Sequence, residues 1–143
     1  MENAHLSKSE WPLDKKSKKA ILKSIQIWKR LGFFFDEVVS SSLLVARQTA
    51  NLIRKKCLVK TKPNIRPEFT NEDIKDILST LLAENRDKTV AVVSDPDILA
   101  RFIKIFHGEI GGDIFFTNGS LAAFRIDSFH PLKTTMMTLI HGV

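Results

Sequence analysis

The sequence is poor in cysteine, with Cys57 alone among 143 residues. A single thiol excludes an internal disulfide and any zinc site built from several cysteines, and a reducing cytoplasm is the expected location. No apolar run approaches the roughly 20 residues that span a bilayer. The first twenty residues also lack the apolar stretch of a secretory signal. The sequence therefore predicts no membrane partner, no metal site and no cofactor.

Repeats, glycine-serine linkers and proline-rich stretches are absent as well. A mass of 16.2 kDa suffices for one domain with a sizeable core and does not favour two. Residues 1–10 are polar and predict a flexible arm, whereas residues 11–143 predict a single continuous domain.

Acidic residues are scarce in the first part of the chain. Residues 1–60 hold 13 Lys/Arg against 5 Asp/Glu, although the formal net charge of the whole chain is only +6. The excess is concentrated in residues 15–29 and 54–56. One interpretation is a solvated lysine face that maintains solubility. The alternative is a basic surface that binds anions, nucleic acid or an acidic membrane surface.

The spacing of apolar residues predicts alternating helices and strands. A helix should begin after the N-cap Asp14 and stop at Gly32, and Ser42 should cap a second helix through Lys56. Short β-branched runs predict buried strands, the clearest being residues 89–93. The further expected elements are strands at 37–40, 58–60, 114–116 and 121–126, with a turn at Asn118-Gly119, and helices from Thr70 and Asp95; residues 132–140 fit strand or helix.

This alternation predicts an α/β domain, a three-layer α/β/α sandwich with a mostly parallel sheet. Ligands of such sheets bind at the carboxyl ends of the strands. The loops after Val39 and Val93 are therefore the informative ones. Ser40, Ser41 and Ser42 can hold a small anion through backbone N–H groups at a helix start, with Arg47 nearby.

Four segments together resemble the histidine phosphatase superfamily, and within it the small phosphohistidine phosphatase branch. They are WPLDKKS (11–17), SSSLLVARQTA (40–50), VAVVSDPDILARFI (90–103) and FFTNGSLAAFRID (115–127). The resemblance implies an opening central strand that ends in an Arg-His pair, whose histidine becomes phosphorylated. It also implies two further arginines and a second histidine around the phosphoryl group.

None of these pocket positions keeps its residue. The chain starts where the loop after the Arg-His pair should run, so we expect the first central strand to be missing from the fold. Trp11 and Val45 stand at the two arginine positions, and Ser94 or Asp95 stands at the second histidine. Arg47 lies about 200° further round the helix than Val45 and does not replace that arginine. The resemblance thus implies the fold and argues against activity.

We therefore expect a degenerate, catalytically inactive relative, which is either a binding module or a decaying gene product. The candidate ligands of a binding module are a phosphorylated protein and a small phosphate compound. An alternative is a phosphomonoesterase or phosphohistidine phosphatase whose true start lies upstream and was miscalled. In the family the missing strand separates those at 38–39 and 89–93. Its loss predicts either direct pairing of these two strands or exposed edges that favour self-association.

Other reactive side chains have simpler interpretations. Asp95 resembles a phospho-acceptor after a strand, but an N-cap role is favoured. Cys57 follows three basic residues that favour a lowered pKa, although a structural role suits it better. His5, His107, His130 and His141 are not placed after a predicted strand at the ligand-binding edge.

Overall fold

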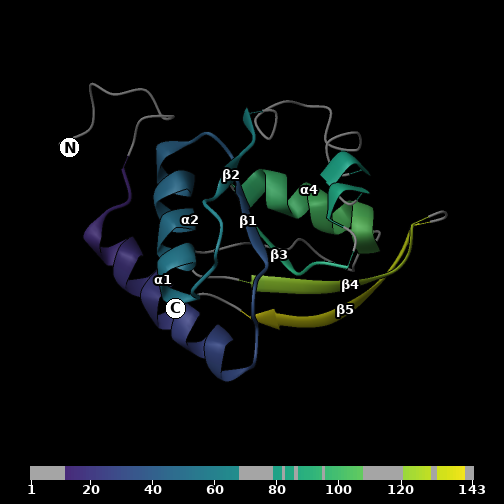
Figure 1. Cartoon of the computed structure of the whole chain (residues 1–143), viewed down its shortest axis with the longest axis horizontal. Helices are drawn as coiled ribbons and strands as arrows, with labels where there is room; N and C mark the ends of the chain where they lie inside the picture. Colours follow the sequence, from purple (N-terminus) through teal and green to yellow (C-terminus); the bar gives the residue numbers. More distant parts are fainter. Residues whose placement is uncertain are drawn as a thin grey trace.

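The computed structural model describes residues 12–67, 79–81, 83–85, 87–94, 96–107, 121–129 and 132–140. In chain order its elements are α1 (Lys15–Arg30), β1 (Glu37–Ser40), α2 (Leu44–Lys56), β2 (Asn64–Ile65), β3 (Val90–Val93), α4 (Pro96–His107), β4 (Leu121–Phe129) and β5 (Leu132–Ile140). Residues 79–81 are also helical. Figure 1 shows α1 and α2 side by side at one side of the sheet and α4 at the other. No helix among these residues is long and apolar enough to cross a membrane.

The central sheet has three parallel strands in the order β2-β1-β3. β1 pairs with β3 over its full length, from Glu37 opposite Val90 to Ser40 opposite Val93. Strands 37–40 and 90–93 are therefore direct neighbours, which confirms one of the two arrangements expected from the resemblance. On its other side β1 pairs with the two-residue strand β2.

Helices cover both faces of this sheet, because successive strand residues point to opposite sides. Val38 and Ala91 join the core formed by α1 and α2, which includes Ile25 and Trp28. Val39 instead packs with Leu81 and with Ile98 and Phe102 of α4. The predicted three-layer α/β/α arrangement is confirmed.

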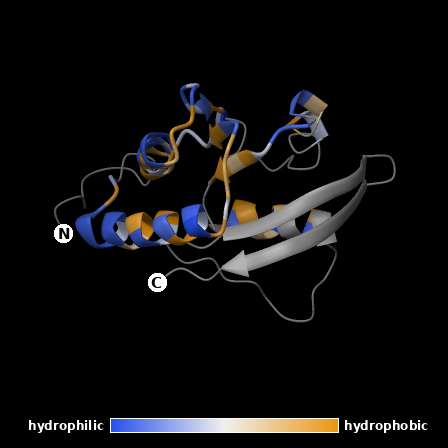
Figure 2. Cartoon of the chain, turned by 60° about the horizontal axis from the view of Figure 1, so that its bottom comes forward, coloured by the Kyte–Doolittle hydropathy of each residue, from blue (hydrophilic) through white to orange (hydrophobic). Residues whose placement is uncertain are grey.

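Both predicted limits of α1 are correct. The Asp14 carboxylate accepts a hydrogen bond from the Ser17 amide at 2.7 Å, as an N-cap should. Gly32 adopts φ +85 just after the last turn. The helix is amphipathic, and Figure 2 shows its hydrophilic and hydrophobic residues alternating along the helix. Its buried residues are Ile21, Ser24, Ile25 and Trp28.

Two local predictions are wrong. Ser42 does not cap α2, since the N-cap is Leu43 and no side chain bonds the first amides there. The strand expected at residues 58–60 is absent because Leu58 adopts a left-handed conformation, φ 55, that ends α2. The chain turns, buries Val59, and pairs with β1 only at β2.

The carboxyl-terminal part forms an antiparallel hairpin of β4 and β5, so residues 132–140 are a strand. The pairing has register shifts near Phe124 and Ser128, and β5 contacts α4. The strand expected at 114–116 and the turn at Asn118-Gly119 lie outside the described residues. At the described end of the hairpin, Phe129 pairs with Leu132.

Candidate functional site

Three polar residues follow the three parallel strands in register, and we call them the edge row: Arg66, Ser41 and Ser94. Two hydrogen bonds extend the ladders past the last paired residues. The Ser41 amide donates to the Val93 carbonyl at 3.0 Å, and the Arg66 amide donates to the Ser40 carbonyl at 2.7 Å. Ser41 therefore lies between Arg66 and Ser94 at the carboxyl edge of the sheet, where ligands of open α/β sheets bind.

Both serine hydroxyls of the edge row are buried and lack a hydrogen-bond partner among the described residues. Ser41 is completely buried. The adjacent Ser40 is equally buried, but its hydroxyl donates to the Ser41 carbonyl at 2.8 Å. Buried hydroxyls are nearly always hydrogen-bonded, since an unpaired one has lost its bonds to water. Two such groups side by side are the main anomaly of this edge.

The amino end of α2 adds further donors beside Ser41. The helix starts at Leu44, its first turn has no acidic residue, and its N-cap makes no side-chain hydrogen bond. The first amides of a helix point outward and carry a partial positive charge. An anion is the natural partner of such an end when no side chain caps it.

Arg47 turns back toward the serine loop although it is exposed. Its Nε donates to the Ser42 carbonyl at 3.1 Å. The structure therefore brings all four candidate anion-binding residues to one loop and helix start. Val45 lies in the first turn of α2, half-buried and uncharged.

Sequence reasoning missed Arg66, the only cation of the edge row. Its guanidinium Nη2 is 3.2 Å from a carboxylate oxygen of Glu84, and its side chain is one-fifth exposed, at 20%. A strand of two residues has no alternating pattern to detect, so no sequence signal marked Arg66 as the residue after a strand. Only the pairing of β2 with β1 places it beside Ser41.

The other residues singled out from the sequence are placed as follows. Ser94 follows β3 within the edge row, whereas Trp11 and Asp95 lie outside the described residues. His107 is the last residue of α4, so its backbone is at the helix end away from Pro96. The three remaining histidines, His5, His130 and His141, lie outside the described residues.

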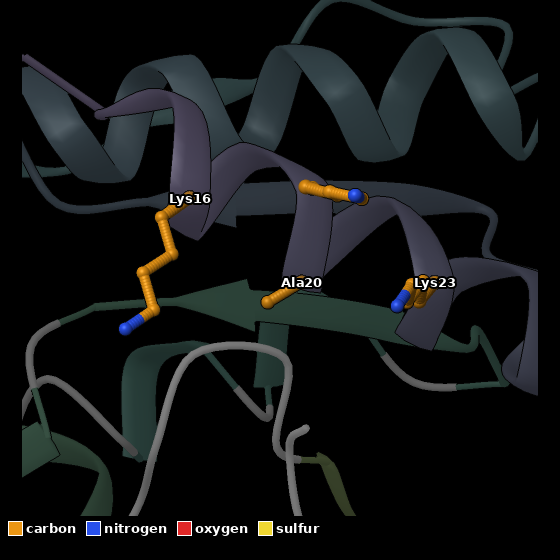
Figure 3. Close-up of a pocket in the computed structure, with 4 residues that line it drawn as sticks. Lys16, Ala20 and Lys23 are labelled. Atoms are coloured by element: carbon orange, nitrogen blue, oxygen red, sulfur yellow. The ribbon is translucent and has the colours of Figure 1, made fainter.

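A surface hollow lies elsewhere, on α1. Lys16, Lys19, Ala20 and Lys23 line it, and Figure 3 shows the labelled three along one side of the helix. None of these residues belongs to the edge row. The hollow presents ammonium groups with no hydrogen-bonding side chain of another kind, so it adds positive charge without shaping a specific site.

Cys57 has a raised pKa because burial disfavours the thiolate, and the Lys29 ammonium offsets this only partly. The interpretation that its basic neighbours lower the pKa of the Cys57 thiol is therefore wrong. Cys57 also packs against the core cluster that contains Trp28, in the last part of α1.

No family model and no curated protein matches this sequence. Its fold does match solved structures. The protein histidine phosphatase SixA, solved with tungstate, is 19% identical with a TM-score of 0.80 over 95% of this chain and 87% of that chain. A protein provisionally described as phosphohistidine phosphatase SixA, from Agrobacterium tumefaciens, is 15% identical with a TM-score of 0.73 over 96% and 87%. A similarly described protein from Nakamurella multipartitia is 16% identical, TM-score 0.68, over 96% and 88%. The chain therefore has the SixA-like phosphohistidine phosphatase fold over nearly its whole length.

Proposed function

We propose that this protein binds a phosphoryl-type oxyanion at the edge row and does not hydrolyse phosphoesters. The observation that carries the proposal is the pair of buried hydroxyls of Ser41 and Ser94 on adjacent strand ends, neither of which bonds to any residue that the structure describes. A bound oxyanion would accept both hydrogen bonds and remove the cost of leaving these groups unpaired.

The donors around this pair all suit the same ligand. The uncapped start of α2 offers amide N–H groups, and Arg66 offers a guanidinium, whose planar fork matches phosphate oxygens. One of the solved structures with this fold was obtained with tungstate, a tetrahedral oxyanion. The ligand is either a phosphorylated side chain of a protein or a small phosphate compound, since both present the same group to the site.

The absence of turnover follows from the residues at the mapped pocket positions. Phosphoryl transfer requires a nucleophile and fixed positive groups that stabilise the charge on the transferring oxygens. Val45 stands where the family resemblance implies an arginine, and its side chain is neither a nucleophile nor positively charged. A serine nucleophile requires a hydrogen-bonded base, and neither Ser41 nor Ser94 has one among the described residues. Binding without reaction is the outcome that this chemistry favours.

Calorimetric titration with orthophosphate and with tungstate tests whether the protein binds an oxyanion at the edge row. We expect saturable binding that Ser41→Ala weakens about tenfold, the value of one hydrogen bond to a charged group. Ser24→Ala is the matched control, because Ser24 lies on α1 and its hydroxyl is also buried, with no hydrogen-bond partner in the described part of the chain. Equal affinity of the native protein and Ser41→Ala would place the anion elsewhere and overturn the proposed site.

An assay of p-nitrophenyl phosphate hydrolysis tests the proposal that the protein does not hydrolyse phosphoesters. We expect the purified chain to release no more nitrophenol than buffer does. Turnover that is retained in Ser24→Ala and abolished in Ser94→Ala would show that the edge row is an active site, and inactivity would then be wrong.

A further inference from the structure

The amino edge of the sheet, opposite the edge row, collects the ends of two helices. α1 leads into β1 and α2 leads into β2, and these strands are parallel neighbours. Both helices therefore end at the amino edge, and in Figure 1 both run toward the lower part of the view. The two helices contact each other, and Cys57 after α2 packs against the core cluster that contains Trp28 of α1.

Positive charge gathers at these two ends. The last turn of α1 holds Lys29 and Arg30, and the last turn of α2 holds Arg54, Lys55 and Lys56. Residues 12–67 include only three acids, and each has a local role in the fold. Asp14 caps α1, Asp36 accepts from the Thr89 amide, and Glu37 pairs with Lys88. None of the four lysines and arginines at 29, 30, 55 and 56 forms an ion pair with a described residue.

Large apolar side chains project into solvent directly after the same basic turns. Leu31 is 59% exposed, Phe34 is 72% exposed and Leu58 is 82% exposed. They account for three of the five large hydrophobic residues that are exposed in the described part of the chain. Leu58 holds a left-handed backbone position that glycine normally occupies, so an exposed leucine there is doubly unfavourable for the isolated fold.

We propose that this amino-edge surface, formed by Lys29, Arg30, Leu31, Phe34, Lys55, Lys56 and Leu58, docks on an anionic lipid bilayer. Peripheral membrane binding combines apolar side chains that enter the headgroup–acyl boundary with lysines and arginines that contact anionic lipids. This surface has both apolar side chains and cations, which come from the ends of α1 and α2 and the loops that follow them. The proposal does not rest on anion binding at the edge row, which lies at the other end of the strands.

Two other occupants fit the surface less well. A nucleic acid would neutralise the cations, but its phosphates offer no apolar partner for Leu31 or Leu58. A second copy would cover the apolar side chains while placing like charges against each other, which is destabilising. The bilayer satisfies both the charge and the apolar area.

Vesicle co-sedimentation tests the proposal with the full chain. We expect binding to phosphatidylcholine vesicles that contain phosphatidylserine, and none to phosphatidylcholine alone. Leu58→Gly should weaken binding about tenfold, through loss of buried apolar area, while its backbone conformation is retained. Lys55→Gln with Lys56→Gln should weaken it by roughly five-fold for each charge.

Two control variants separate this surface from general charge and hydrophobicity. Lys16→Gln with Lys19→Gln removes the same charge from the amino-terminal half of α1 and should leave binding within twofold of the native protein. Ile65→Ser removes an exposed apolar side chain, 39% exposed, at the opposite edge of the sheet and should have no effect.

Three results would overturn the proposal. The first is equal loss in Lys16→Gln/Lys19→Gln, which would mean nonspecific attraction. The second is binding to duplex DNA that Lys55→Gln/Lys56→Gln abolishes and Leu58→Gly does not change, together with no vesicle binding. The third is a concentration-dependent dimer in analytical ultracentrifugation that Leu58→Gly dissociates. Failure of vesicle binding leaves phosphate or tungstate titration at the edge row unaffected, so the two proposals fail separately.

Discussion

Leu58 occupies at the end of α2 the same backbone position that Gly32 occupies at the end of α1. Both residues are left-handed, with φ 55 and φ 85. Each is followed by a residue whose amide reaches back to the third-last helical carbonyl, Val59 to Arg54 and Phe33 to Trp28, both at 3.0 Å. This is the Schellman arrangement, in which glycine is preferred because a Cβ atom is strained at positive φ.

Leu58→Gly should therefore stabilise the fold by about 1 kcal/mol, because the left-handed strain disappears and an 82% exposed side chain loses few contacts. The measurement is urea unfolding followed by circular dichroism. A lower midpoint in the variant would show that Leu58 has contacts that outweigh its strain.

Gly32→Ala is the opposite case and should destabilise the fold by about 1 kcal/mol. A Cβ atom at residue 32 would meet nothing within 4 Å, so the cost would come from the backbone alone. An unchanged unfolding midpoint in Gly32→Ala would contradict this account.

Ser41→Ala should raise the free energy of unfolding by about 1 kcal/mol while it weakens anion binding, because it removes a buried hydroxyl that has no hydrogen-bond partner among the described residues. Ser24→Ala should give a similar increase and leave binding unchanged. Thermal unfolding with and without phosphate measures both quantities. Destabilisation in Ser41→Ala would mean that its hydroxyl already has a partner in the unliganded protein.

The cap of α1 makes the stability of the helix depend on pH. The hydrogen bond from the Ser17 amide lowers the pKa of the exposed Asp14 carboxyl below its ordinary value of 3.8. Its stabilising contribution is therefore present above the unfolded-state pKa and is lost as the pH falls through the lowered folded-state pKa. Asp14→Asn should lose the pH-dependent part while keeping a capping group. Unfolding midpoints from neutral pH down to pH 2–3 would show an acid-dependent decrease in the native protein that exceeds that of Asp14→Asn.

Cys57 should react slowly with thiol reagents at neutral pH, because burial raises its pKa and lowers the thiolate fraction. Lys29→Gln should slow the reaction further, since the ammonium of Lys29 favours the thiolate. The rate of modification against pH, with free cysteine as the reference, measures the shift. Faster modification in Lys29→Gln would mean that the ends of α1 and α2 are not held as the structure describes.

Glu84→Gln should tighten phosphate binding at the edge row. The Glu84 carboxylate lies 3.2 Å from the Arg66 guanidinium, where it competes with an incoming anion. The pair is partly exposed, so the expected gain in affinity is modest, about two- to five-fold. Calorimetric titration measures it, and Glu84→Asp, which keeps the charge, is the control. Weaker binding in Glu84→Gln would mean that the carboxylate positions Arg66 for the ligand.

The limits of α1 could be predicted because their causes are local: Asp14 and Gly32 act through bonds within a few residues. Of the three consecutive phenylalanines that precede β1, Phe34 is exposed, while Phe33 and Phe35 pack against the core. The strand β2 was not predictable. A strand of two residues is too short to show an alternating pattern of apolar and polar residues. The left-handed turn at Leu58 could not be predicted either, because glycine is the usual residue at such a position.

The amino-acid sequence by itself determined the helices, the strands of the parallel sheet that have β-branched runs, and the family resemblance, because periodicity and short motifs depend on near neighbours along the chain. Only the tertiary structure decided that Ser41, Ser94 and Arg66 form one row. Their adjacency depends on the register of strands separated by tens of residues, and register is set by packing against helices on both faces. The same holds for the amino-edge surface, since two helices end beside each other only because their strands are paired.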